Sequence, residues 1–213
     1  MTQQARAVET RALIIRAAAD VFGARGYGGS SLTEICAAAG LTKGAVYFHF
    51  ASKDALALAV VDAQHARAIA MGAALRHSDQ PGLHVLLRLT FELSEQLRND
   101  PVTRAGIRLT MESSALSRPV VTPYEEWFVA IEMLLRRAIA DGDVRPDADV
   151  AAAARFISPA YTGVQVVSNV LTGRSDLVQR VQEMWLIVLP SLVLPERWPQ
   201  LRELPRQMAA EWG

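Results

Sequence analysis

Residues 31–56 read SLTEICAAAGLTKGAVYFHFASKDAL, and they carry the strongest structural signal in the chain. Ser31 followed by Glu34 is a capping-box pattern, which predicts a helix over Leu32–Ala39. The turn Gly40-Leu41-Thr42 comes next, and its threonine can cap a second short helix over Lys43–Phe48. A helix, a three-residue turn containing glycine and a second short helix form a helix-turn-helix, the arrangement that lays a recognition helix in the major groove of DNA.

On both sides of this segment the patterning is also helical, with apolar residues about every 3.6 positions. A helix at about Val8–Arg25 is expected to end at Gly26, and Ser52 can cap a long helix after the helix-turn-helix. A helix is expected between Pro81 and Pro101, followed by a shorter one that continues through Leu109. After a loop at Ser113–Pro123, three further helices are expected over Tyr124–Asp141, Asp147–Thr172 and Ser175–Leu194. A proline-containing tail is expected after Leu194. The sequence therefore predicts an all-α fold, with an N-terminal three-helix helix-turn-helix head (residues 1–51) and a larger helical ligand-binding and dimerisation body (residues 52–213).

Composition excludes several classes of protein. Of the 213 residues 51% are hydrophobic and 21% charged, ordinary values that exclude intrinsic disorder. No apolar run approaches the ~18 residues of a membrane helix, and the polar N-terminus lacks a signal-peptide core, so a cytoplasmic protein without a membrane partner is expected. The single cysteine, Cys36, excludes an internal disulfide and a cysteine-based metal cluster, and we expect it to be a buried, small apolar side chain.

Charge is distributed unevenly although the net charge is zero. Residues 1–53 contain six basic and three acidic side chains, a net charge of +3, so the remainder carries −3. Both lysines of the chain, Lys43 and Lys53, lie in this first quarter. A basic head on an acidic body is typical of one polyanion-binding module attached to another function.

The residues of the predicted recognition helix suit DNA. Gly44 and Ala45 are small enough to let the helix lie close to base edges, and Lys43 supplies a positive charge for phosphate or guanine. Arg6 and Arg11 could reach the flanking backbone or the minor groove. Three apolar residues are expected to hold the module together: Val46, Phe48 and Phe50.

The segment AGLTKGAVYFHFASK resembles the TetR family of one-component bacterial regulators, and the resemblance covers residues 8–56. The resemblance implies that positions matching five residues contact operator DNA: Thr42, Lys43, Tyr47, His49 and Lys53. Phe48 stands where the family more often has a second tyrosine. Double-stranded operator DNA is therefore the expected partner.

The body is expected to dimerise, because one short recognition helix contacts too few base pairs for useful specificity. A homodimer on a palindromic operator would place two recognition helices on the DNA and so contact more base pairs. The apolar stripes of the last two long helices are the expected dimer surface, although part of them must be core and the sequence does not divide the two: Ala151, Ala154, Ile157 and Tyr161, then Leu177, Val181, Met184, Trp185, Val188 and Leu192.

The body is also expected to bind a small neutral signalling molecule, because aromatic walls with a few neutral polar groups suit such a ligand. The candidate lining residues are Gln64, Leu87, Phe91, Trp127, Ile131, Phe156, Tyr161 and Gln165. The segments Pro101–Leu109 and Pro123–Trp127 resemble the γ-butyrolactone-receptor branch of the TetR family, which answers γ-butyrolactone, butenolide or furan signals and controls antibiotic clusters. That resemblance implies that Trp127 packs on the ligand and that Gln64 and the region of Tyr161 form hydrogen bonds with it.

Two other interpretations stay open at this stage. The body could belong to a multidrug-type sensor or a pseudo-receptor that answers antibiotics. An all-α enzyme is a further alternative, but the sequence lacks G-x-S-x-G, H-E-x-x-H, P-loop and G-x-G-x-x-G motifs, so no catalytic residue, cofactor or metal is expected.

Overall fold

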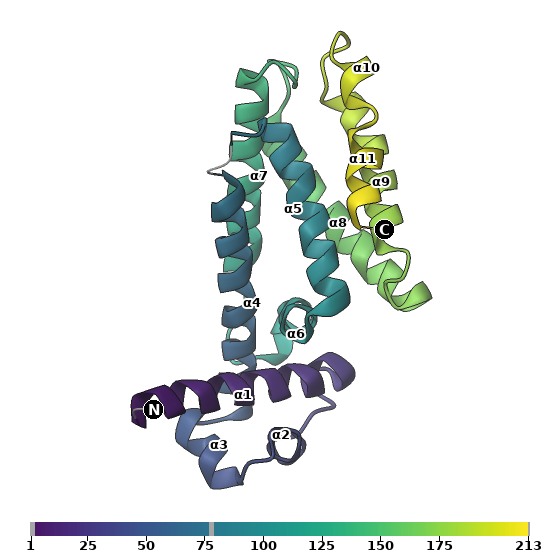
Figure 1. Ribbon diagram of the computed structural model, residues 1–213. Coiled ribbons are helices and arrows are strands. Elements are labelled where there is room, and N and C mark those ends of the chain that lie inside the picture. Colours follow the sequence, from purple (N-terminus) through teal and green to yellow (C-terminus); the bar gives the residue numbers. More distant parts are fainter. Residues whose placement is uncertain (1–2, 77–78, 213) are drawn as a thin grey trace. The chain divides into compact units, whose positions relative to one another are not determined.

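The computed structural model describes residues 3–76 and 79–212 (Figure 1). In these residues the ordered structure is helical, and β pairing is limited to an isolated bridge between Val144 and Val193. The all-α prediction is therefore confirmed. No single helix of the described part has both the length and the apolarity of a membrane span; the helical segments Lys43–His49 and Lys53–Leu75 pass such a test only jointly, across a 58° bend.

Backbone contacts divide the chain into two compact units. Unit 1 contains the described residues up to Ile69 together with Asn99–Val121, and unit 2 contains Ala70–Arg98 and the chain from Thr122 onward. The helices that lie in or begin in unit 1 are α1 (Gln3–Arg25), α2 (Leu32–Ala39), α3 (Lys43–His49), α4 (Lys53–Arg76) and α6 (Pro101–Met111), followed by the 3₁₀ turn η1 (Ser113–Ala115). Helix α4 begins in unit 1 and continues past Ile69 into unit 2.

The helix ends of unit 1 follow the expected capping chemistry. The Glu34 amide donates to Ser31 Oγ at 3.2 Å and the Ser31 amide donates to Glu34 Oε2 at 2.9 Å, so the capping box at the start of α2 is confirmed. The Ala45 amide donates to Thr42 Oγ1 at 3.2 Å, which caps α3. Gly26, after α1, and Gly40, after α2, have φ values of +71° and +65°, where a side chain would be strained.

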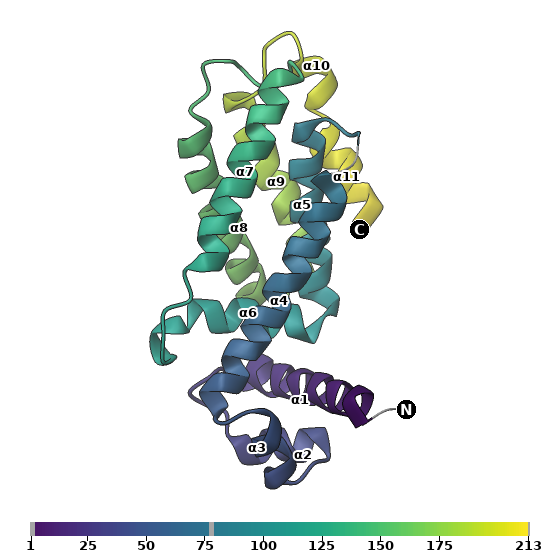
Figure 2. The ribbon, with the colours of Figure 1, turned by 90° about the vertical axis from the view of Figure 1, so that its left-hand side faces the viewer.

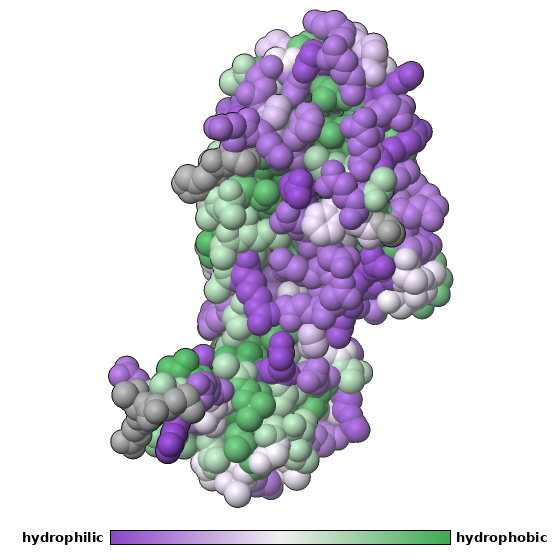
Figure 3. All heavy atoms as spheres, viewed as in Figure 1, coloured by the Kyte–Doolittle hydropathy of each residue, from purple (hydrophilic) through white to green (hydrophobic). Residues whose placement is uncertain are grey.

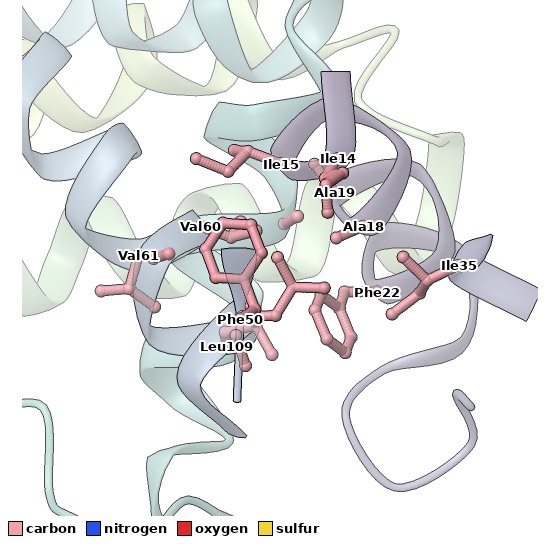
Figure 4. Close-up of a cluster of buried hydrophobic side chains, with 14 of the residues drawn as sticks. Ile14, Ile15, Ala18, Ala19, Phe22, Ile35, Phe50, Val60, Val61 and Leu109 are labelled. Atoms are coloured by element: carbon pink, nitrogen blue, oxygen red, sulfur yellow. The ribbon is translucent and has the colours of Figure 1, made fainter. Parts of the chain in front are cut away.

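Unit 1 is held by one apolar core that helices from distant parts of the sequence share. Ile14, Ala18 and Phe22 of α1 point into it, and Ile35 of α2, Val60 of α4 and Leu109 of α6 meet them there (Figure 4). Cys36 is buried in the same cluster, as expected. The α1 helix packs against both α2 and α6, so α6 belongs to the core of unit 1, although it lies far outside the predicted head (residues 1–51) in the sequence.

Unit 2 is a set of packed helices with the 3₁₀ turn η2 (Leu189–Ser191) after α9. Its helices are α5 (Gly82–Asn99), α7 (Thr122–Ala140), α8 (Val150–Thr172), α9 (Leu177–Val188), α10 (Trp198–Leu201) and α11 (Leu204–Trp212). Helix α8 packs against both α7 and α9 (Figure 2). The boundaries differ from the predicted ones by a few residues, chiefly at the start of α8 and the end of α9.

The end of the chain differs from the expected tail. Residues 198–212 form α10 and α11, and α11 packs against α9 with Leu204 and Met208 buried. Pro199 and Pro205 each occupy the second position of a helix, where the missing amide hydrogen would have no helical partner. These prolines therefore lie in the first turns of two helices, whereas the sequence analysis expected a proline-containing tail there.

Candidate DNA-binding and ligand-binding sites

The exposed side of α3 is the candidate DNA-binding surface. Thr42, Lys43, Gly44 and Tyr47 are exposed, while Ala45 is half-buried. Thr42 Oγ1 uses an acceptor site to cap the helix, so its hydroxyl hydrogen is left to donate elsewhere. An ammonium, two hydroxyls and a glycine on one exposed helix match what phosphate oxygens and base edges require.

Phe48 differs from the prediction. Val46 and Phe50 are buried as expected, but Phe48 is 82% exposed. The cause is helical geometry: Val46 and Phe50 are four positions apart and share the inner face, whereas Phe48, about 200° further round than Val46, must point outward. Its ring meets the His49 ring edge-on, with centroids 5.2 Å apart. Phe48 therefore belongs to the exposed surface of α3 and not to the core.

Lys53 is already bonded in this structure. Its Nζ donates to the carbonyl oxygens of Tyr27 and Ser30 at 2.9 and 3.0 Å, and it lies 4.2 Å from the centroid of the Tyr27 ring. These contacts hold the turn between α1 and α2 against the start of α4. A phosphate contact by Lys53 would have to compete with them, and that contact stays a prediction.

The remaining predicted DNA contacts lie on α1 and at the end of α3. Arg6 is exposed on the first turns of α1. Arg11 is also exposed, and its guanidinium lies over the Phe50 ring, 5.1 Å from the centroid, which positions it beside the recognition helix. His49 is half-buried at the end of α3.

The end of α6 holds the last turn of α1 and the α1–α2 turn through two side chains that the sequence interpretation missed, Arg108 in the helix and Glu112 directly after it. Arg108 Nη1 donates to the Gly23 carbonyl at 2.9 Å, and the Tyr27 amide donates to Glu112 Oε2 at 2.7 Å. Arg108 and Glu112 also pair with each other at 2.8 Å. Partial burial alone would raise the pKa of Glu112, but the hydrogen bonds from Arg108 and Tyr27 outweigh it and lower that pKa. In the sequence the pair is an ordinary i, i+4 combination, which by itself indicates only a surface ion pair.

Unit 2 contains a chain of buried hydrogen bonds across α5, α8 and α9. Trp185 Nε1 donates to Thr90 Oγ1 at 2.8 Å, and Thr90 Oγ1 donates to the Leu87 carbonyl at 2.7 Å. Ser94 Oγ donates to the Thr90 carbonyl at 2.7 Å and lies 3.1 Å from the Tyr161 hydroxyl. Because buried polar groups need hydrogen-bond partners, these hydrogen bonds fix the positions of the side chains in the middle of unit 2.

The direction of the last bond follows from counting hydrogens. A serine hydroxyl has one hydrogen, and that of Ser94 is used on the Thr90 carbonyl. The Tyr161 hydroxyl must therefore donate to Ser94, so Tyr161 keeps only acceptor capacity. Burial raises the pKa of Tyr161, so its hydroxyl stays protonated near neutral pH.

The predicted ligand-lining residues fall into three groups. In unit 2 Trp127 is half-buried on α7, and five others are buried: Leu87, Phe91, Ile131, Tyr161 and Gln165. Gln64 is buried in unit 1, where α4 and α6 approach so closely that a Cβ on Gly106 would lie 2.4 Å from the Gln64 Cβ. Phe156 does not join the buried set, because it is 59% exposed on the outer side of α8.

The structure divides the apolar stripes of α8 and α9 between core and surface. Of the residues nominated for the dimer surface, all but the half-buried Ala151 are buried within the chain itself. The exposed apolar residues of the two helices form a different set: Phe156, Val167, Val170, Leu171 and Ile187. A surface hollow of about 440 Å³ lies among them, with Phe156, Val167, Met184 and Ile187 in its lining. By contrast, hydrophilic residues cover most of the face of unit 2 that Figure 3 shows.

Comparison with known proteins gives two family matches. Residues 14–60 match the family described as "Bacterial regulatory proteins, tetR family", and residues 80–194 match "Tetracyclin repressor-like, C-terminal domain". The chain is 38% identical over 197 residues to the A-factor receptor protein of Streptomyces griseus, covering 92% of this chain and 68% of that protein.

Two solved structures are similar over almost the whole chain. The γ-butyrolactone receptor (ArpA-like protein) shares 36% identity with a TM-score of 0.85, covering 97% of this chain and 99% of that one. The TetR-family protein CprB from Streptomyces coelicolor, solved in complex with its biological operator sequence, shares 36% identity with a TM-score of 0.82 and the same coverage.

Proposed function

This chain belongs to the TetR family of bacterial transcriptional regulators, and we propose that it is a ligand-responsive repressor that binds a palindromic operator as a homodimer in the cytoplasm. The observation that carries the proposal is the exposed α3 surface of Thr42, Lys43, Gly44 and Tyr47, held on a buried core. A relative of similar fold was solved with its operator bound. In the proposed complex Lys43 and Tyr47 bind phosphate oxygens or base edges, and Arg6 and Arg11 reach the flanking backbone.

A second copy of the chain is the proposed occupant of the exposed apolar surface of α8 and α9. Ile187 is 78% exposed there, and the exposed Phe156 and Val167 line the same hollow. A hollow lined by such side chains is unfavourable in water and is removed when two copies pack together. Twofold symmetry would then present two recognition helices to two operator half-sites.

The proposed ligand is a small uncharged molecule of the γ-butyrolactone, butenolide or furan type, and the regulated genes are those of antibiotic or other secondary metabolism. The names of the A-factor receptor and the γ-butyrolactone receptor support this ligand class. Half-buried Trp127, with buried Phe91 and Ile131, supplies apolar walls in unit 2. Tyr161 can accept a hydrogen bond but has no hydrogen left to donate, so the ligand is expected to bring a hydroxyl group to it.

Ligand and DNA are proposed to oppose each other by linkage. The ligand favours a position of α4 in which the recognition helices no longer match the operator, and operator binding lowers ligand affinity by the same factor. The continuity of α4 from Lys53 to Arg76, through the end of unit 1, supports its role as the connection.

A mobility-shift assay on the DNA upstream of the protein's own gene tests the proposal. We expect a shifted band that one class of a γ-butyrolactone, butenolide and furan panel releases. The variant Trp127→Ala should bind the operator normally and lose release, whereas Val129→Ala, an exposed control on the same helix, should behave as wild type. A shift released by antibiotics and by no panel member would replace the ligand proposal with a multidrug or pseudo-receptor role. The absence of any shift would overturn the repressor itself.

A further inference from the structure

The recognition helix carries an exposed aromatic ring that folding does not explain. At 82% exposure, Phe48 is more exposed than any other large apolar side chain that the structure describes. Val46 and Phe50 already anchor α3 to the core from the opposite face. The one ring contact of Phe48 among the described residues is the edge-on contact with His49, which orients the ring without covering it.

Gly44 leaves an open space beside this ring. In a helix, residues four apart are neighbours on one face, so Phe48 and Gly44 occupy successive turns of the exposed side of α3. A Cβ placed on Gly44 would meet a single atom within 4 Å, the Thr42 Oγ1 at 4.0 Å. The exposed surface of α3 therefore has a small notch over Gly44, and Phe48 lies one helical turn further along the same surface.

The chemistry of the notch selects its occupant. A phenyl ring cannot donate to phosphate, so Phe48 cannot make the polar contact that Tyr47 and Lys43 can make beside it. In the major groove the apolar group on the base edges is the thymine C5-methyl, which side chains without polar atoms contact. A methyl group is also small enough to enter a notch left by a missing side chain.

We propose that Phe48 and Gly44 together form a thymine-methyl pocket, so that this protein requires a thymine at one defined position in each operator half-site. The proposal rests on the proposed operator binding and deepens it, because it assigns base specificity to a residue without a polar group. Lys43 and Tyr47 supply affinity from the same helix, and the notch supplies discrimination.

Single thymine-to-deoxyuridine replacements test the pocket, because they remove the C5-methyl and leave every hydrogen-bonding group in place. The footprinted operator is prepared with each half-site thymine replaced in turn, symmetrically in both half-sites, and its affinity is measured by fluorescence anisotropy. Burying one methyl is worth ~0.8 kcal/mol, about fourfold in affinity, so the critical replacement should weaken wild-type binding about 16-fold across the two half-sites.

Two variants assign this effect to the notch. Phe48→Ala should bind the thymine and deoxyuridine operators equally, and Gly44→Ala, which fills the notch and favours the helix, should also lose the preference. Circular dichroism should show that both are folded, because both positions are exposed. A wild-type protein that binds the operator but is indifferent to every replacement, or a Phe48→Ala variant that keeps the wild-type penalty, would overturn the pocket and leave the repressor proposal intact. A wild-type protein that binds no operator would overturn both.

Discussion

Replacing Gly106 by alanine should destabilise the protein, although alanine is the better helix former. Gly106 lies in α6 against α4, and an added Cβ would lie 2.4 Å from the Cβ and 2.9 Å from the Cγ of Gln64, with the Val60 carbonyl at 3.4 Å. The Cβ of Gln64 is fixed to its own backbone and cannot rotate away, so the two helices must separate locally. Overpacking of this kind costs about 1–3 kcal/mol, and the severity of the clash indicates the upper end.

The expected net effect is a loss of about 2 kcal/mol, because alanine returns about 1 kcal/mol through its helix propensity. For a chain of this size that corresponds to a fall in the thermal midpoint of about 4–8 °C. Gly72→Ala is the matched control: Gly72 also lies inside a helix, α4, but nothing lies within 4 Å of its added Cβ. That variant should gain about 0.5–1 kcal/mol, which raises the midpoint by about 1–4 °C.

Thermal and urea unfolding of both variants, followed by circular dichroism at one protomer concentration, measures the difference. The concentration must be held constant because dimerisation shifts the midpoint by mass action. If Gly106→Ala is as stable as Gly72→Ala, the close approach of α4 and α6 does not exist in solution.

Three further outcomes follow, two from the candidate sites and one from Asp176, the residue before α9. Lys43→Ala should weaken operator binding and lower the slope of log affinity against log salt by about one; an unchanged slope would remove Lys43 from the phosphate contacts. Tyr161→Phe should raise the ligand concentration needed for release about fivefold, because a hydrogen bond of ~1 kcal/mol is lost, and leave operator affinity unchanged; equal release by both proteins in the mobility-shift assay would remove the ligand from this hydroxyl. Hydrogen bonds from Ser168 and Thr172 help to lower the pKa of Asp176 to about 2, so its stabilising contribution is complete above about pH 4 and is lost as pH falls toward 2. Asp176→Asn should therefore reduce the acid sensitivity of the unfolding midpoint in this range, and an unchanged profile would contradict the assignment.

Local chemistry made the head predictable from sequence. Helix limits there depend on groups within three or four residues of each other, such as Ser31 with Glu34 and Thr42 with Ala45. The left-handed backbone of Gly26 and Gly40 is equally local. Because these interactions involve only neighbouring residues, the sequence was sufficient to predict both ends of α2 and the first residue of α3 correctly.

What a residue faces depends on the rest of the fold, and there the prediction was less accurate. Phe48 was expected in the core because it is apolar, but the inward-facing positions are those of Val46 and of Phe50, the residue that caps α3. The apolar stripes of α8 and α9 are a second example. Periodicity identifies an apolar face of a helix, but the pattern is the same whether that face packs inside the chain or against another chain. The structure separates buried Trp185 from exposed Ile187, two residues apart on one helix.

The hold of α6 on the α1–α2 turn also bears on how such regulators can be recombined. Arg108 and Glu112 bond to Gly23 and Tyr27, more than 80 positions earlier in the chain. Because the bonded groups in the head are a backbone carbonyl and a backbone amide, a chimera that exchanges only residues 1–51 would keep these bonds only if the new turn followed the same backbone path beside Arg108 and Glu112. The path of the α1–α2 turn and the side chains at positions 108 and 112 therefore form one unit, so the part to transfer for a new operator specificity is the head with α6, although the two are encoded far apart.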